Sequence, residues 1–400
     1  MIAPALVKRT TDRRAARSVA GQVGRFEARR FLRHPLPWIG VLAGFWMMWS
    51  AFGTTAPVWR RDSVYLAGAM LPLSALVFLW FNHLQIRERQ LAEVLDALPT
   101  SPADRLRGIQ LGLVGPTGLA VAASAIGLAY LAVGQPVGTI PWWEVVAGPL
   151  MVAALGMLGL ALGRLLHHPV IAPIALAALA FFQLVAESNA AFSSGVPTRA
   201  VEWLAPWVPP ETFEPVVIWD RRLAVGHGFF LIGAIILFAT LPLLSRTRAR
   251  WLIPLGVAAA GVGIFAYSSA MVPTGDVTRF EPLLIEQRCE ERGGVNYCAL
   301  DEFSQWIPRW QQTVRQVDTL IPVEIDWVVQ RSGHFFFSED AWSERLEGVV
   351  AYNEFEWDRE GVTPNHALAL ALAAAEGSVG LPTRPQIRTY GTGNRFDCVP

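Results

Sequence analysis

Long runs of apolar residues alternate with short charged segments through the first two-thirds of the chain. A helix needs about 20 apolar residues to cross a hydrocarbon core roughly 30 Å thick, and lipid leaves unpaired backbone groups unsatisfied, so spanning segments are expected to be helical. The pattern predicts seven such helices, at residues 37–53, 64–82, 109–133, 145–165, 169–187, 226–244 and 251–271. The sequence therefore predicts an α-helical integral membrane protein.

The remainder, residues 272–400, has the composition of a soluble domain. It holds 20 Asp and Glu against 11 Arg, whereas the part before it holds 13 acidic and 22 basic residues. Segments 321–329 and 347–355 are rich in β-branched and aromatic residues, and 303–318 and 364–376 have helical composition. We expect a mixed α/β domain here.

Basic residues favour one orientation in the membrane. Nine lie in the arm of residues 1–36, four follow the second predicted helix, and Arg246, Arg248 and Arg250 separate the last two helices. The alternate loops hold five arginines. Because Lys and Arg are enriched in cytoplasmic loops, the N-terminus is predicted to be cytoplasmic, in the plasma membrane. An odd number of helices then makes the tail extracytoplasmic.

All three cysteines, Cys289, Cys298 and Cys398, lie in this tail, on the side where disulfides persist. Cys289 and Cys298 flank Gly293 and Gly294, which predicts a turn closed by a Cys289–Cys298 bridge. Pairing of either cysteine with Cys398 is the alternative.

The tail leaves two further questions open. His334, Asp340 and His366 could bind a metal only if the fold gathered them, so no metal site is predicted. Five tryptophans form either a hydrophobic core, which we favour, or a surface for carbohydrate or peptide. They are Trp306, Trp310, Trp327, Trp342 and Trp357.

The sequence lacks the residue motifs that several functions require. Lys8 is the only lysine in the chain and lies in no glycine-rich loop, so the sequence contains no nucleotide-binding P-loop. No His-Glu-x-x-His or Gly-x-Ser-x-Gly motif occurs either. Glu144 and Glu187 fall at predicted helix ends and not at the membrane midplane, where a proton relay needs them. We predict no catalytic residue, no bound cofactor and no nucleic-acid partner.

The basic arm contains a segment that can form an amphipathic helix. Phe26 and Phe31 can lie on an apolar face, beside a basic face formed by Arg29, Arg30 and Arg33. Such a helix is expected to lie along the inner interface of the lipid bilayer, until the following proline turns the chain into the first span. The alternative is an unattached basic arm that only fixes the orientation.

A second amphipathic segment, residues 86–108, follows the second span. Apolar residues recur there at helical spacing, Pro99 stops the pattern, and Thr100 or Ser101 can cap a new helix starting at Pro102. A short cytoplasmic helix between two spans suits docking of another protein.

At this point the sequence resembles the type-2 permeases of ATP-binding-cassette exporters. The resemblance rests on Glu27 to Pro35, on Glu93 to Ser101, and on the long outer segment 188–225. It implies a six-span bundle over residues 37–245, a permease dimer, and a separately encoded ATPase subunit that binds ATP and Mg. The residues that would dock the ATPase are Leu91, Glu93, Leu95, Leu98, Pro99 and Arg105.

The chain departs from that family by its seventh span, within residues 246–271, and by its external domain. Gly159 and Gly163 form a small-x-x-x-small pair that predicts close helix packing, either within one protomer or between two. Three functions are weighed: export of an amphipathic or lipid-like cargo, a membrane-anchored sensor or scaffold whose external domain binds a ligand or partner, and a membrane enzyme. The exporter permease is favoured.

Overall fold

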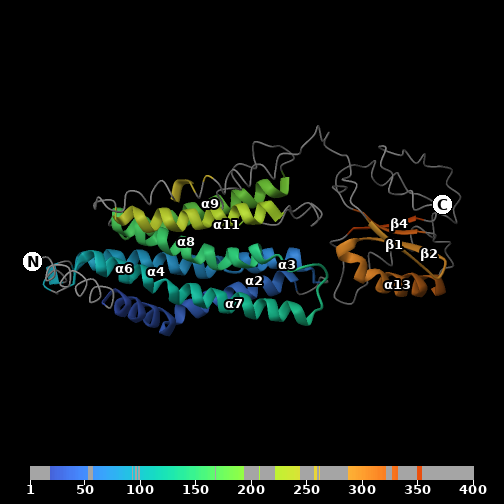
Figure 1. Cartoon of the computed structure of the whole chain (residues 1–400), viewed down its shortest axis with the longest axis horizontal. Coiled ribbons are helices and arrows are strands. Elements are labelled where there is room, and N and C mark those ends of the chain that lie inside the picture. The colour runs from blue at the N-terminus through green and yellow to red at the C-terminus, as the bar shows by residue number, and fades with distance from the viewer. Residues whose placement is uncertain are drawn as a thin grey trace, which may run out of the picture.

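The computed structural model is mostly helical, with a helical bundle and a small β-sheet beyond one end of it (Figure 1). It describes residues 19–52, 57–91, 93–94, 97, 100–166, 168–192, 207, 221–243, 256–258, 261, 287–320, 327–331 and 349–353.

The described helices follow the predicted spans closely. Residues 19–33 form a first helix, and the later helices are α2 (Pro35–Phe52), α3 (Trp59–Gly68), α4 (Leu71–Gln90), α6 (Pro102–Gly112), α7 (Val114–Val133), α8 (Trp142–Leu166), α9 (Ile171–Phe192) and α11 (Arg221–Thr240), with a short 3-10 helix, η2 (Leu241–Leu243). Three stretches are long and apolar enough to cross a membrane: Asp62–Gln90, Pro102–Val133 and Trp142–Leu166. The predicted span 251–271 lies outside the described residues, apart from 256–258 and 261.

Two predicted continuous helices are interrupted. The second span consists of α3 and α4, which meet at Ala69 and Met70; Pro72 follows in the first turn of α4 and has no N–H to continue the ladder. The third span consists of α6 and α7, which meet at Leu113, and Pro116 follows there. Hydropathy alone does not reveal such breaks, since the residues next to each break, such as Leu66 and Leu73 or Leu111 and Val114, are apolar on both sides.

The core of the bundle is the contact between α4 and α8. Leu73, Val77 and Phe78 of α4 and Val152 and Leu160 of α8 have no exposed surface, and they belong to one cluster of apolar side chains. The interior also holds polar groups: the Asn82 side-chain amide donates to the Gly159 carbonyl at 3.1 Å. Burial of apolar side chains on both helices fixes them as the rigid centre of the fold.

One residue of the outer segment 188–225 is anchored inside the bundle. Gln183 of α9 donates from Nε2 to the Trp207 carbonyl at 2.8 Å and accepts from the Trp207 N–H at 3.3 Å. The Trp207 indole donates to the Val64 carbonyl at 2.9 Å, and its ring covers Gly68 of α3. The rest of the segment between α9 and α11 lies outside the described residues.

The tail contains a four-stranded sheet. Strands β1 (Gln287–Arg292), β2 (Val295–Leu300), β3 (Trp327–Arg331) and β4 (Val349–Asn353) are ordered β1-β2-β3-β4; β1 and β2 are antiparallel, and the other pairs are parallel. A 3-10 helix, η3 (Asp301–Trp306), and α13 (Ile307–Leu320) lie between β2 and β3. The predicted helix 364–376 lies outside the described residues.

The β1–β2 hairpin carries the predicted disulfide. Gly293 and Gly294 have φ of 66° and 86°, which a two-residue type I′ turn requires. The turn places Cys289 directly opposite Cys298, and the two are bonded. Cys398 lies outside the described residues.

A second apolar cluster, separate from the bundle core, fills the tail. Trp306 and Trp310 are buried, so these two residues belong to the core and not to a ligand-binding surface. The cluster also contains Val58 and Val137, from the loops that join α2 to α3 and α7 to α8. These two valines form a parallel β-bridge, so the tail packs on the bundle end formed by these two loops.

Candidate functional site

The candidate site is the connection between α4 and α6, at the bundle end opposite the tail (Figure 1). The sequence predicted one docking segment over residues 86–108. In the structure α4 continues to Gln90, residues 93 and 94 are helical, and a new helix, α6, starts at Pro102, as predicted. Leu95, Leu98 and Pro99 lie outside the described residues.

Two predicted docking residues in the connection are exposed. Leu91 directly follows α4 and is 42 % exposed, and Glu93 is also exposed. Val94, which also follows the helical pattern, is 68 % exposed. Leu91 and Val94 thus place apolar side chains on the surface of this connection, outside the long apolar helices.

The start of α6 is fixed by its cap. The Asp104 N–H donates to Ser101 Oγ at 3.1 Å, and the Ser101 hydroxyl donates to Asp104 Oδ2 at 2.6 Å. Pro102 occupies the first turn, where the missing N–H costs nothing. Ser101 is therefore the cap, which decides between the two residues that the sequence offered.

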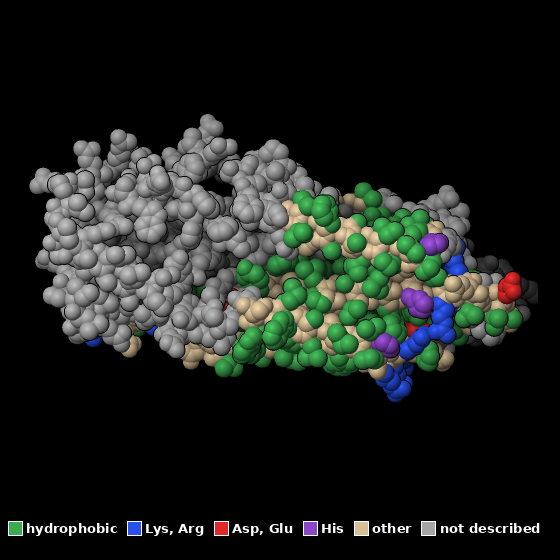
Figure 2. Space-filling model, turned by 180° about the vertical axis from the view of Figure 1, so that it is seen from behind, with side chains coloured by type: hydrophobic (Ala, Val, Ile, Leu, Met, Phe, Trp, Pro, Cys, Tyr) green, Lys and Arg blue, Asp and Glu red, His purple; other side chains and the backbone are tan. Residues whose placement is uncertain are grey.

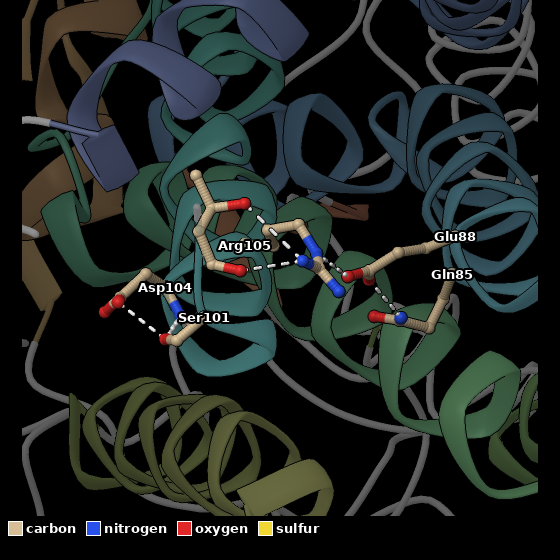
Figure 3. A network of polar contacts seen from close by, with 6 residues as sticks. Gln85, Glu88, Ser101, Asp104 and Arg105 are labelled. Carbon is tan, nitrogen blue, oxygen red and sulfur yellow. Dashed lines mark hydrogen bonds and ion pairs between the residues drawn. The ribbon is translucent and has the colours of Figure 1, made fainter. Parts of the chain in front are cut away.

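A buried ion pair joins the two helices below this tip (Figure 3). Arg105 Nε of α6 lies 3.2 Å from Glu88 Oε1 of α4, and the two side chains are only 10 % and 9 % exposed. Arg105 Nη1 also donates to the Thr100 carbonyl at 2.8 Å, and Gln85 Nε2 donates to Glu88 Oε2 at 2.7 Å. Each partner thus has neutral hydrogen bonds in addition to the opposite charge.

This network changes the role assigned to Arg105. The sequence placed it among the docking residues, but its guanidinium faces Glu88 and Thr100 inside the fold. Arg105 therefore helps to position the connection through contacts within the chain. Glu88 and Gln85, which sequence reasoning missed, do the same; their only signal was polar character at the end of a long apolar helix.

The helix of residues 19–33 differs from the predicted interfacial helix on one face. Phe26, Arg29 and Arg33 are exposed, as expected for residues at a membrane surface. Phe31 instead is buried in the bundle core, with its ring edge-on to Trp80 of α4 at 5.5 Å. Arg30 also faces inward, over the Trp80 ring at 5.5 Å. The helix ends before Pro35, as predicted.

Glycines explain why this helix lies against the bundle. Gly24 faces α6, and Gly108 and Gly115, on α6 and α7, face the first helix; a Cβ on any of the three would lie 2.7–2.8 Å from atoms opposite. Gly112 lies between them, against Glu27. Small residues one turn apart let two backbones approach closely, so the arm is held by packing as well as by charge.

Burial also affects the acidic residue of this contact. Desolvation raises the pKa of Glu27, opposed by the positive charges of Arg30 and Arg87. Arg30 Nη1 lies 3.7 Å from Glu27 Oε2. The first helix therefore brings one carboxyl and its arginine into the space beside α4.

The predicted packing pair lies within one chain. Gly159 of α8 faces the backbone carbonyl of Phe78, and Gly163 faces that of Asn82, both on α4. This pair belongs to the α4–α8 core, so it provides no contact between two protomers. Among the described residues, no group of three or more His, Cys, Asp or Glu side chains is arranged to hold a metal ion.

Comparisons of the chain with known protein families, with curated proteins and with solved structures give no match. Function must therefore be argued from the bundle, its connection and its tail.

Proposed function

We propose that this chain is the membrane-spanning subunit of an ATP-driven exporter and docks a separately encoded ATPase, which binds ATP and Mg, through the α4–α6 connection. The observation that carries the proposal is the combination at this connection: exposed Leu91 and Val94 at the tip, and the buried Arg105–Glu88 pair at its base. An apolar tip on a rigid base suits transmission of force from another protein.

The packing below the connection supports a coupling role. α4 carries Glu88 and also packs along α8 over most of its length, including Phe78 against Gly159. A displacement of the tip would move α4 and α8 together, because close-packed helices shift as rigid bodies and do not deform continuously. ATP binding and hydrolysis on the partner would supply that displacement. A second copy of the chain would complete the path along which the cargo crosses the membrane.

The surface of the bundle favours an amphipathic or lipid-like cargo. Its exposed side chains along α2 and α7 are mainly apolar, including Leu42, Trp46, Val121 and Ile126. Such a surface can accept an acyl chain from the bilayer, whereas a small ion would need polar ligands in the path.

The docking proposal is tested with charge substitutions at the tip. Val94→Asp and Leu95→Asp should each lower, at least tenfold, co-purification with the ABC-type ATPase that this proposal requires, because an unpaired carboxylate would be buried in the contact. ATPase turnover of the complex should fall with it. Membrane abundance should be unchanged.

Gln22→Asp is the matched control, since it puts the same charge on an exposed residue at the same bundle end. If the tip variants retain an identified ATPase as fully as Gln22→Asp does, the docking proposal is wrong. The sensor or scaffold function, with the tail as the binding domain, would then be preferred. The packing of the tail on Val58 and Val137 would connect that domain physically to the bundle.

Orientation in the plasma membrane is part of the proposal: seven spans, N-terminus inside, tail outside. The tail and the α4–α6 connection lie at opposite ends of the bundle, which this orientation requires. In a Cys398→Ser background, a cysteine at exposed Gln312 of α13 should react with a membrane-impermeant maleimide in intact cells. A cysteine at exposed Gln90 should react only after the membrane is opened. The reverse pattern would exclude this orientation.

A further inference from the structure

Basic side chains gather at one end of the apolar surface of the bundle. Figure 2 shows arginine and histidine side chains together there, directly beside the hydrophobic surface. His83 and Arg87 of α4 are exposed and follow Trp80 by one and two helical turns. They share a face of α4 with this tryptophan.

The first helix contributes two more groups to the same place. Arg30 Cζ lies 5.5 Å from the centre of the Trp80 ring, and the His34 ring centre lies 5.2 Å from it. Both side chains are half-buried. The end of the first helix and α4, about 50 residues apart in the sequence, therefore place their basic groups around the Trp80 indole.

The protonation pattern of His34 leaves a donor for a ligand. The Leu36 N–H donates to His34 Nδ1 at 3.3 Å, so Nδ1 is an acceptor and the neutral ring carries its proton on Nε2. This contact also fixes the ring at the start of α2. The next exposed residues of α2 are apolar, beginning with Trp38, whose indole donates to the Leu32 carbonyl at 2.9 Å.

Among the described residues, the basic groups of this cluster outnumber the carboxyls beside them. Glu27, 3.7 Å from Arg30, is the carboxyl that both Arg30 and Arg87 influence. Two guanidinium groups thus act on one carboxyl, whose charged form burial disfavours. An anion bound here would complete the balance.

We propose that Arg30, His34, His83 and Arg87 bind the phosphate of an anionic phospholipid, whose acyl chains lie along the adjoining exposed face of α2. The position of the cluster supports this proposal, because arginine and histidine N–H donors lie where the apolar surface ends, at the level of a headgroup phosphate. Arginine and histidine N–H groups supply the charge-assisted hydrogen bonds that a phosphodiester accepts. The site does not depend on transport or on an ATPase.

The test uses the full chain, purified in detergent, with phosphatidylglycerol and phosphatidylcholine of identical acyl chains as probes, and bound lipid counted by native mass spectrometry. The wild type should retain phosphatidylglycerol preferentially. The double variant Arg30→Gln/Arg87→Gln should weaken phosphatidylglycerol binding at least tenfold and leave phosphatidylcholine unchanged. Arg87→Gln alone should weaken it several-fold; because the Arg87 side chain is exposed, this variant should fold normally.

The matched control is Arg25→Gln/Arg107→Gln, which removes the same charge from two exposed arginines. This control should change phosphatidylglycerol binding less than twofold. An equal loss in both double variants would show diffuse attraction to a negative surface and overturn the site. Displacement of phosphatidylglycerol by millimolar inorganic phosphate would overturn the assignment to a lipid and indicate a soluble anion.

Discussion

Glu88→Ala is expected to destabilise the protein by about 3–5 kcal/mol, the usual cost of removing one member of a buried ion pair. The Arg105 side chain is only 10 % exposed, and it would lose the Glu88 carboxylate while keeping the Thr100 carbonyl as one of its acceptors. Thermal unfolding of the purified protein should show a lower melting temperature, and the yield of folded protein should fall.

Two controls separate this effect from a simple loss of charge. Arg107 pairs with Asp104 at 3.6 Å on the surface, with its side chain 64 % exposed, so Arg107→Gln should change stability by less than about 1 kcal/mol. The double variant Glu88→Met/Arg105→Met removes both buried charges and should recover much of the stability lost in Glu88→Ala. A double variant as unstable as the single one would contradict the buried-pair account.

Gly159→Ala is expected to be the other strongly destabilising change, by about 2 kcal/mol or more. The added methyl group would meet the Phe78 backbone carbonyl, and backbone yields less readily than a side chain. Overpacking of a dense core costs about 1–3 kcal/mol, and here it would push α8 away from α4. The melting temperature in detergent measures the loss.

Gly118→Ala provides the matched comparison. Gly118 also lies in an apolar helix, α7, but a Cβ there has nothing within 4 Å. Its replacement should be neutral or slightly stabilising, since alanine favours a helix by about 1 kcal/mol over glycine. Equal melting temperatures for the two variants would mean that the α4–α8 contact is looser than the structure has it.

The sequence predicted the elements of the bundle well because hydropathy reports burial in lipid and in protein alike. The predicted span 145–165 corresponds to α8, and Ser101 and Pro102 marked the start of α6 through local chemistry that depends on a few neighbouring residues. The Gly293–Gly294 turn and the disulfide beside it were predictable for the same reason.

Contacts between distant segments were not predictable. Hydropathy treats Phe31 as a lipid-facing residue, yet the glycines of α6 and α7 bring its helix close enough to bury it against Trp80. The sequence suggests that Arg105 is a surface arginine, because it does not reveal that Glu88, 17 residues earlier, lies beside it. The hydrophobic periodicity of the sequence predicts where each helix lies. Which helix faces pack together depends on which small residues of the two helices come into contact.

The contact of the first helix with α6 and α7 has a consequence for biosynthesis. Residues 20–28 leave the ribosome before their binding surface exists, because Gly108 to Gly115 are made roughly 90 residues later. At about 5–20 residues per second, this delay is on the order of ten seconds. During that interval α2, α3 and α4 are made while the small-residue face of the first helix has no binding surface on α6 and α7. This end of the bundle is thus assembled in a fixed order, because the first helix can pack only after α6 and the start of α7 have been made.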